Sequence, residues 1–419
     1  MNNYKELIFS SMGAQAYLAI AHFVVLWLTL NILGSENRGI YIVMLTWVQF
    51  FSGISHLSLG QTILNRAIKS SGLAWLAHTV GTSSAVALLV SLFSCFLMAV
   101  GFFLFPAFFG GSIPKSFFYV MLLAVPLFVW LSYNRSILIS LGKLDVAYKN
   151  DVVSQTIMLL LMPLMYVVGI YGAAISLLAS KLLTTVMGAK VIASCLSRKP
   201  KISKVSMKSY LFKSLALHPA IICSVFIGYT DILMINYFLG VVESGFYQMA
   251  VQLLAMMLIV PQVVSNVLFT LCADHGITKA WLKYKKIVIL TCGFMLLSSV
   301  FAFLLAPYII PMVLGDLAVS SVPVFKLLLF TILGQSLAAL MSPQWIGRGL
   351  FKTVSGISAF TVVVNIALNY LFIPKCGIEG AAYTTIIVHT FSILVNGGLF
   401  VYIWREFTLK NRTKVEGQI

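Results

Sequence analysis

Long apolar segments follow one another along almost the whole of this 419-residue chain, and they limit its possible folds more than any other feature. A helix needs about 20 mostly apolar residues to cross roughly 30 Å of hydrocarbon, and nearly every segment here is that long. Hydrophobic residues make up 60% of the chain and charged residues only 9%, a composition unlike that of soluble domains. The sequence therefore predicts an all-α integral membrane protein without a soluble domain.

The number of apolar segments predicts about twelve transmembrane helices. Only short polar stretches separate them, so each helix is expected to cross the membrane in the direction opposite to its predecessor. The expected spans are residues 10–33, 39–62, 74–105, 116–141, 151–169, 172–195, 211–239, 244–271, 286–312, 322–346, 354–374 and 378–404.

Basic residues collect on one side of the membrane under this assignment. All but five of the 28 Lys and Arg residues fall at the two termini, in the loops that share their side, or at adjoining helix ends. The exceptions are Arg38, Lys115 and Lys375 on the other side, and Lys181 and Lys326 within helices. The positive-inside rule then places both termini in the cytoplasm. The net charge of +17 indicates topology and contact with anionic lipid, and we expect no nucleic-acid partner.

Two short motifs recur in the two halves of the chain. The pattern L-G-x-x-x-x-G-x-Y occurs at residues 33–41 and 239–247, an offset of 206 residues. The pattern G-I-x-G-A-A occurs at residues 169–174 and 377–382, an offset of 208 residues. Such agreement between two motifs predicts a duplicated bundle.

The duplication predicts two six-helix repeats in parallel orientation, a transporter-like arrangement with the transport path expected between them. We expect a bundle over residues 1–197, a basic cytoplasmic linker over 198–210, a second bundle over 211–405 and a cytoplasmic tail over 406–419. Small residues allow tight turns and close helix contacts. Structural turns of this kind are predicted at Gly34, Gly39, Gly240, Gly245, Gly377 and Gly380.

Ionisable residues inside the predicted spans are candidates for function, because a charge in hydrocarbon is costly unless it faces water or a partner. Asp231 is the acidic residue that lies deepest in these spans, and it could bind a proton or Na⁺ or form a structural ion pair. Lys181 lies midway along its helix, where an amine could attract a diphosphate or neutralise Asp231. Arg135 and Lys326 lie close enough to helix ends to extend to the membrane surface.

Uncharged polar residues form stripes on three of the predicted helices. Gln15 and His22 share one face of the first helix, and Gln49 and His56 share one face of the second. Asn365 and Asn369 lie one turn apart in the eleventh helix. These side chains could line a hydrated cavity for sugar hydroxyls, or they could hydrogen-bond neighbouring helices.

Motifs of catalysis and cofactor binding are missing from the sequence. It contains no P-loop pattern G-x-x-x-x-G-K-S/T, no G-x-S-x-G and no H-E-x-x-H. Its six histidines do not occur at metal-ligand spacing, and its six cysteines include no C-x-x-C pair. The sequence therefore predicts a protein that is not an enzyme and has no cofactor or metal.

Together, the repeated glycine motifs, Asp231 and the Asn365 to Ala382 segment resemble the polysaccharide biosynthesis flippases. These are the Wzx-type O-antigen transporters of the multidrug/oligosaccharidyl-lipid/polysaccharide exporter superfamily. The resemblance extends over nearly the whole chain, although the first half lacks an Asn pair before Gly169.

The resemblance implies a flippase of the bacterial inner membrane. Its cargo would be an undecaprenyl-diphosphate-linked repeat unit, moved from the cytoplasmic to the periplasmic leaflet by alternating access and driven by H⁺ or Na⁺. Partners would be the lipid-linked oligosaccharide, the bilayer and other membrane proteins of polysaccharide assembly. The alternatives are a drug or metabolite antiporter of the same superfamily and a membrane enzyme of polysaccharide assembly; a lipid II flippase fits less well, because that family has fourteen helices.

Overall fold

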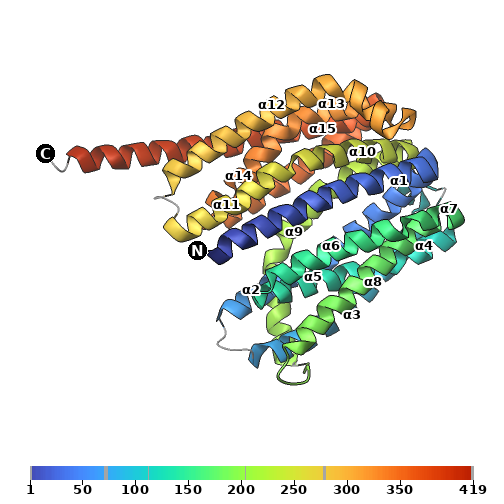
Figure 1. Cartoon of the computed structure of the whole chain (residues 1–419), viewed down its shortest axis with the longest axis horizontal. Helices are drawn as coiled ribbons and strands as arrows, with labels where there is room; N and C mark the ends of the chain where they lie inside the picture. Colours follow the sequence, from blue (N-terminus) through green and yellow to red (C-terminus); the bar gives the residue numbers. More distant parts are fainter. Residues whose placement is uncertain (1, 70–73, 112, 203, 277–279, 417–419) are drawn as a thin grey trace. The chain divides into compact units, whose positions relative to one another are not determined.

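The computed structural model describes residues 2–69, 74–111, 113–202, 204–276 and 280–416, and these residues form α-helices and short 3₁₀-helices without a strand (Figure 1). Nine described helical stretches are long and apolar enough to cross a membrane. A tenth is added if α10 (Val241–Met257) and α11 (Ile259–His275), which meet at a 43° bend, form one broken span. The prediction of an all-α membrane protein is therefore confirmed.

The chain packs into two compact units, Met1–Gly245 and Phe246–Ile419. This division by packing does not test the domain boundaries expected from the sequence, which stay predictions. The first unit holds α1 (Asn2–Ser55), α2 (Leu59–Lys69), α3 (Ala74–Leu104), α4 (Lys115–Leu122), α5 (Ala124–Ser140), α6 (Leu144–Leu161), α7 (Met165–Val168), α8 (Ile170–Ser194) and α9 (Lys204–Leu239). Beyond α10 and α11, the second unit holds α12 (Trp281–Leu314), α13 (Val322–Leu328), α14 (Ile332–Gly347) and α15 (Phe351–Glu416).

Two helices contain a glycine at which the chain reverses. Gly34 interrupts α1 with a φ of 73°, and Gly377 interrupts α15 with a φ of 63°. This left-handed region is open to glycine and strained for other residues. In Figure 1 each helix turns back on itself, so its two halves run in opposite directions. The halves correspond to the spans predicted on either side of the two glycine motifs.

Two predicted boundaries are wrong. The span expected over 151–169 begins earlier, because α6 starts at Leu144, directly after a turn in which Gly142 has a φ of 73°. The span expected over 39–62 is broken, because α1 ends at Ser55 and α2 begins at Leu59, with Leu57 and Ser58 at positive φ between them. In the first case, charged residues in the opening turns of a helix resembled a loop in the sequence.

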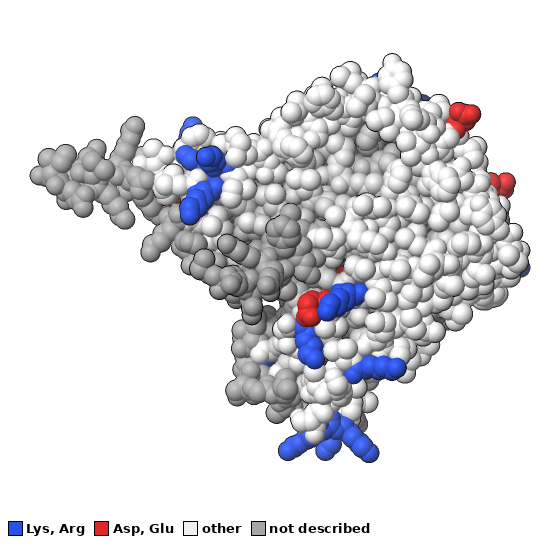
Figure 2. All heavy atoms as spheres, in the orientation of Figure 1, with Lys and Arg blue, Asp and Glu red and all other residues white. Residues whose placement is uncertain are grey.

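Apolar side chains cover the outside of the helices as well as the inside. On α3, Leu89, Phe93 and Phe96 are each about 60% exposed, whereas Ala87 and Met98 on the opposite face are buried. Figure 2 shows that most of the visible surface carries no charged side chain. An apolar exterior of this extent suits a surface that faces lipid rather than water.

Candidate functional site

A partly open cavity of about 330 Å³, with charged and polar groups in a largely apolar lining, lies in the first unit between α5, α6 and α8. Its charged residues are two cations, Arg135 and Lys181, and one carboxylate, Asp151, so their formal charges sum to +1. The remaining lining residues are Phe128, Leu131, Ser132, Asn134, Leu138, Ala147, Asn150, Ser154 and Thr184. Charged groups at this density inside a membrane-spanning bundle are a candidate site for a ligand of opposite charge.

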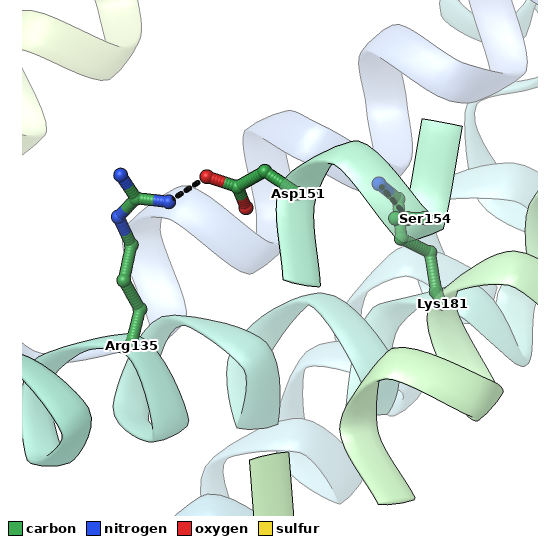
Figure 3. Close-up of polar contacts among 4 residues, drawn as sticks. All are labelled: Arg135, Asp151, Ser154 and Lys181. Carbon is green, nitrogen blue, oxygen red and sulfur yellow. Dashed lines mark hydrogen bonds and ion pairs between the residues drawn. The ribbon is translucent and has the colours of Figure 1, made fainter. Parts of the chain in front are cut away.

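Arg135 of α5 forms an ion pair with Asp151 of α6 at one side of the cavity (Figure 3). The guanidinium also lies 5.6 Å from the ring centroid of Tyr148, one turn before Asp151 on the same helix. Both side chains of the pair are about 40% exposed, so a ligand can reach them. An ion pair in such a position adds little to stability and can be broken by a competing charge.

Lys181 of α8 extends toward α6 at the other side of the cavity. Its amine donates a hydrogen bond to the hydroxyl of Ser154 over 3.2 Å and lies 5.7 Å from the ring centroid of Phe128. In the part of the chain that the structure describes, no carboxylate lies within ion-pair distance of this amine. The negative charge of Asp151 is near enough to act on the Lys181 amine, although the two do not form an ion pair. Lys181 is therefore a half-buried cation that lacks a direct counter-ion.

The cavity extends inward from one end of the bundle. Arg135 lies five residues before the end of α5, which corresponds to about 7.5 Å of helix. Lys181 lies thirteen residues before the end of α8, which corresponds to about 20 Å. Since α6 runs back between them, α5 and α8 end on the same side. A ligand entering from that side would meet the Arg135 and Asp151 pair before it reaches Lys181.

The polar residues predicted on α1 and at the break that follows it differ in their surroundings. His22 is exposed, and it is close enough to Lys181 for the charge of that amine to act on its ring. Gln15 is partly exposed on the same half of α1. Gln49 is partly buried on the second half. His56 lies in the break between α1 and α2, where its Nδ1 accepts a hydrogen bond from the Ser58 backbone N–H over 3.4 Å. The cavity lining includes none of these four side chains.

Asp231 and the asparagine pair also lie away from this lining. Asp231 is partly buried on α9, and the exposed Ser224 and Gly228 precede it on the same helix. Asn365 and Asn369 are buried on α15 in the second unit, where the amide of Asn369 donates to the side-chain oxygen of Asn365 over 3.2 Å. The carboxylate whose charge acts on Lys181 is therefore Asp151, whereas one sequence prediction expected Asp231 to neutralise this amine.

Sequence reasoning missed Asp151 and underrated Arg135. Asp151 was assigned to the very start of a span, yet it lies two turns inside α6. The spacing of residues on α6 could have indicated that Asp151 faces the inside of the bundle. Ala147, Ser154 and Met158 are buried and share one helical face with Asp151. Among the described residues, no group of three His, Cys, Asp or Glu side chains could hold a metal ion.

Comparisons with known proteins agree with the fold and the sequence motifs. Residues 5–271 match the family described as polysaccharide biosynthesis protein. The structure is similar to an inward-facing multidrug resistance MATE family transporter of the MOP superfamily, with a TM-score of 0.72 and 14% identity over 96% of each chain. No curated protein matches the sequence significantly.

Two further solved structures share the fold. Lipid II flippase MurJ in its inward closed conformation has a TM-score of 0.75 and 15% identity, covering 94% of this chain and 90% of that one. A MOP superfamily transporter from Pyrococcus furiosus has a TM-score of 0.54 and 15% identity, covering 94% of this chain and 96% of that one. With identities of 14% and 15%, these similarities establish the fold that this chain shares with the three proteins.

Proposed function

Because the chain belongs to the polysaccharide biosynthesis protein family, we propose that it is a flippase for a polyprenyl-diphosphate-linked oligosaccharide. The proposed cargo is an undecaprenyl-diphosphate-linked O-antigen or polysaccharide repeat unit. It would pass from the cytoplasmic to the periplasmic leaflet of a bacterial inner membrane by alternating access. The similarity to the lipid II flippase MurJ supports a lipid-linked cargo.

The observation that carries this proposal is Lys181, a half-buried amine whose described polar partner is the Ser154 hydroxyl. Burying an ammonium group without a carboxylate is unfavourable unless a ligand supplies the opposite charge. The diphosphate of the cargo carries that charge, and Arg135 provides a second cation in the same cavity. Arginine binds phosphate through two parallel N–H donors, which gives such a site geometric specificity.

The cavity volume indicates which part of the cargo it would hold. About 330 Å³ is at the lower end of small-molecule sites, which span roughly 300–1,000 Å³. That space suits a diphosphate with little else. The polyprenyl chain would remain in the bilayer, and the sugars would extend beyond this cavity.

A cation gradient is the proposed energy source. One elementary charge that moves with the membrane potential contributes about 2.3 kcal/mol per 100 mV, so a single H⁺ or Na⁺ per cycle could bias transport. The positive-inside pattern supports cytoplasmic termini. Other membrane proteins of polysaccharide assembly are proposed partners, since the repeat unit must be made before transport and joined to others after it.

The proposal is tested in a strain whose own copy of the gene is deleted. Replacement of Lys181 by Ala should reduce surface polysaccharide and leave lipid-linked repeat units in the cytoplasmic leaflet, while the protein level in the membrane is unchanged. The matched control is Lys190→Ala, because Lys190 is exposed on the same helix. Normal surface polysaccharide in the deletion strain itself would reject the function, and normal polysaccharide with Lys181→Ala would remove Lys181 from it.

A drug or metabolite antiporter is the second candidate, supported by the similarity to the MATE family transporter. A cavity with net positive charge disfavours cationic drugs, so this candidate requires an anionic or neutral substrate. Deletion would then change resistance to such compounds and leave surface polysaccharide intact. A membrane enzyme of polysaccharide assembly would instead leave chemically unfinished saccharide on the periplasmic side.

A further inference from the structure

We propose that Asp151 is a displaceable counter-ion that competes with an incoming phosphate for Arg135. Asp151 holds Arg135 while the cavity is empty and releases it when an anionic ligand enters. This inference rests on the proposed function, because it requires that the cavity receive a phosphate group. It assigns to Asp151 control over how tightly the site binds an anion.

The geometry separates the two cations into one that is paired and one that is available. In Figure 3 the carboxylate of Asp151 points to Arg135, and the amine of Lys181 lies beside Ser154. Asp151 and Ser154 are three residues apart on α6, which is about 4.5 Å of helix rise. The two cations therefore meet α6 on adjacent turns, a spacing that a two-phosphate group can bridge.

The exposure of the ion pair allows the exchange. Arg135 and Asp151 have side-chain exposures of 43% and 38%, so the helices around them leave either group free to change partner when the pair opens. A phosphate that approaches from this end of the bundle meets Arg135 first and can replace Asp151 there before it reaches Lys181.

A competing carboxylate serves a carrier, which has to bind its cargo and then release it. Two unopposed cations would hold any anion, including the phosphodiester headgroups of the surrounding lipid. With Asp151 in place, binding at Arg135 exchanges one anion for another, and the reverse exchange releases the cargo. A site that binds too tightly does not turn over, which applies to transport as it does to conduction.

The inference predicts that tighter binding and slower transport occur together in one variant. Purified protein in phosphatidylcholine nanodiscs is titrated with farnesyl diphosphate, and surface polysaccharide is measured with the same variants in the deletion strain. Asp151→Asn should bind the probe up to about fivefold more tightly than the wild type, since a partly exposed ion pair no longer competes. The same variant should restore little polysaccharide.

Three further variants serve as controls. Asp151→Glu keeps the carboxylate and should behave as the wild type. Asp145→Asn removes an exposed carboxylate from the first turn of the same helix and should change neither measurement. Asp151→Ser provides a second neutral side chain if the Asn variant is unstable, and the unfolding temperature of every variant is recorded.

The outcomes separate the inference from the proposed function. If folded Asp151→Asn and Asp151→Ser bind the probe no more tightly than the wild type, the competing role of Asp151 is wrong, while the phosphate site stands. If the wild type does not bind the probe and Arg135→Ala and Lys181→Ala restore full polysaccharide, the cavity is not a phosphate site. The role of Asp151 then fails together with those of Arg135 and Lys181, while the flippase function is decided by the deletion strain itself. Addition of phosphatidylglycerol to the nanodiscs should inhibit probe binding by Asp151→Asn more than by the wild type.

Discussion

Arg38 donates a hydrogen bond from Nη1 to the backbone carbonyl oxygen of Gly245 over 2.7 Å, although 207 residues separate the two. The contact joins the two copies of the glycine motif that recur at an offset of 206 residues. Gly39 lies directly against the backbone of Val241, and a Cβ on Gly245 would lie 3.3 Å from the Cα of Gly39. The repeated glycines thus allow the two motif copies to approach each other at backbone distance.

Replacement of Arg38 by Met should destabilise the protein. The side chain is 1% exposed, and a hydrogen bond from a charged donor contributes about 1.5–3 kcal/mol. We expect the free energy of unfolding in detergent, measured with denaturant, to fall by about that amount. Lys115→Met, at an exposed position, is the control and should leave it unchanged. Equal stability of the Arg38 variant and the wild type would contradict the structural role.

Replacement of Gly39 by Ala should prevent the close contact with Val241. The added Cβ would lie 2.2 Å from the Val241 carbonyl oxygen, and neither atom can move aside easily, because the oxygen is part of the backbone and the Cβ is bonded directly to it. Overpacking of this kind costs about 1–3 kcal/mol or more. The measurement is the unfolding temperature in detergent. Gly228→Ala is the matched control, because a Cβ there meets no atom within 4 Å.

Replacement of Gly377 by Ala should strain the reversal within α15. A φ of 63° costs a residue with a Cβ about 1–2 kcal/mol. Gly398→Ala, in the same helix, places its methyl group in open space. It should stabilise the helix, because alanine is more favourable there than glycine by up to about 1 kcal/mol. The two variants should therefore shift the unfolding temperature in opposite directions. Equal shifts would show that the backbone at Gly377 is not strained by alanine.

Replacement of Asp231 by Asn should reduce surface polysaccharide without loss of the folded protein from the membrane. The reason is that a carboxylate within a membrane-spanning helix is costly and is retained mainly where it serves transport or a partner. Asp316→Asn is the control, since Asp316 is exposed at the start of a 3₁₀-helix. Wild-type polysaccharide from the Asp231 variant would remove this residue from the transport mechanism.

Local sequence patterns predicted much of the fold. The apolar segments predicted membrane helices, because a helix that crosses the bilayer needs about 20 mostly apolar residues. The glycine motifs located the reversals at Gly34 and Gly377, because a positive φ favours glycine strongly. The helix boundary at Leu144 was missed, because charged residues in the first turns of a helix look like a loop when only hydropathy is considered.

By itself, the sequence determined that this chain is a helical membrane protein and that Lys181 is an unusual amine within a span. Only the tertiary structure decided which charges surround it. Arg135, Asp151 and Lys181 lie on three different helices, and their grouping depends on how those helices pack and rotate. Hydropathy and spacing describe each helix separately, whereas a counter-ion and its partner are a property of the contact between helices.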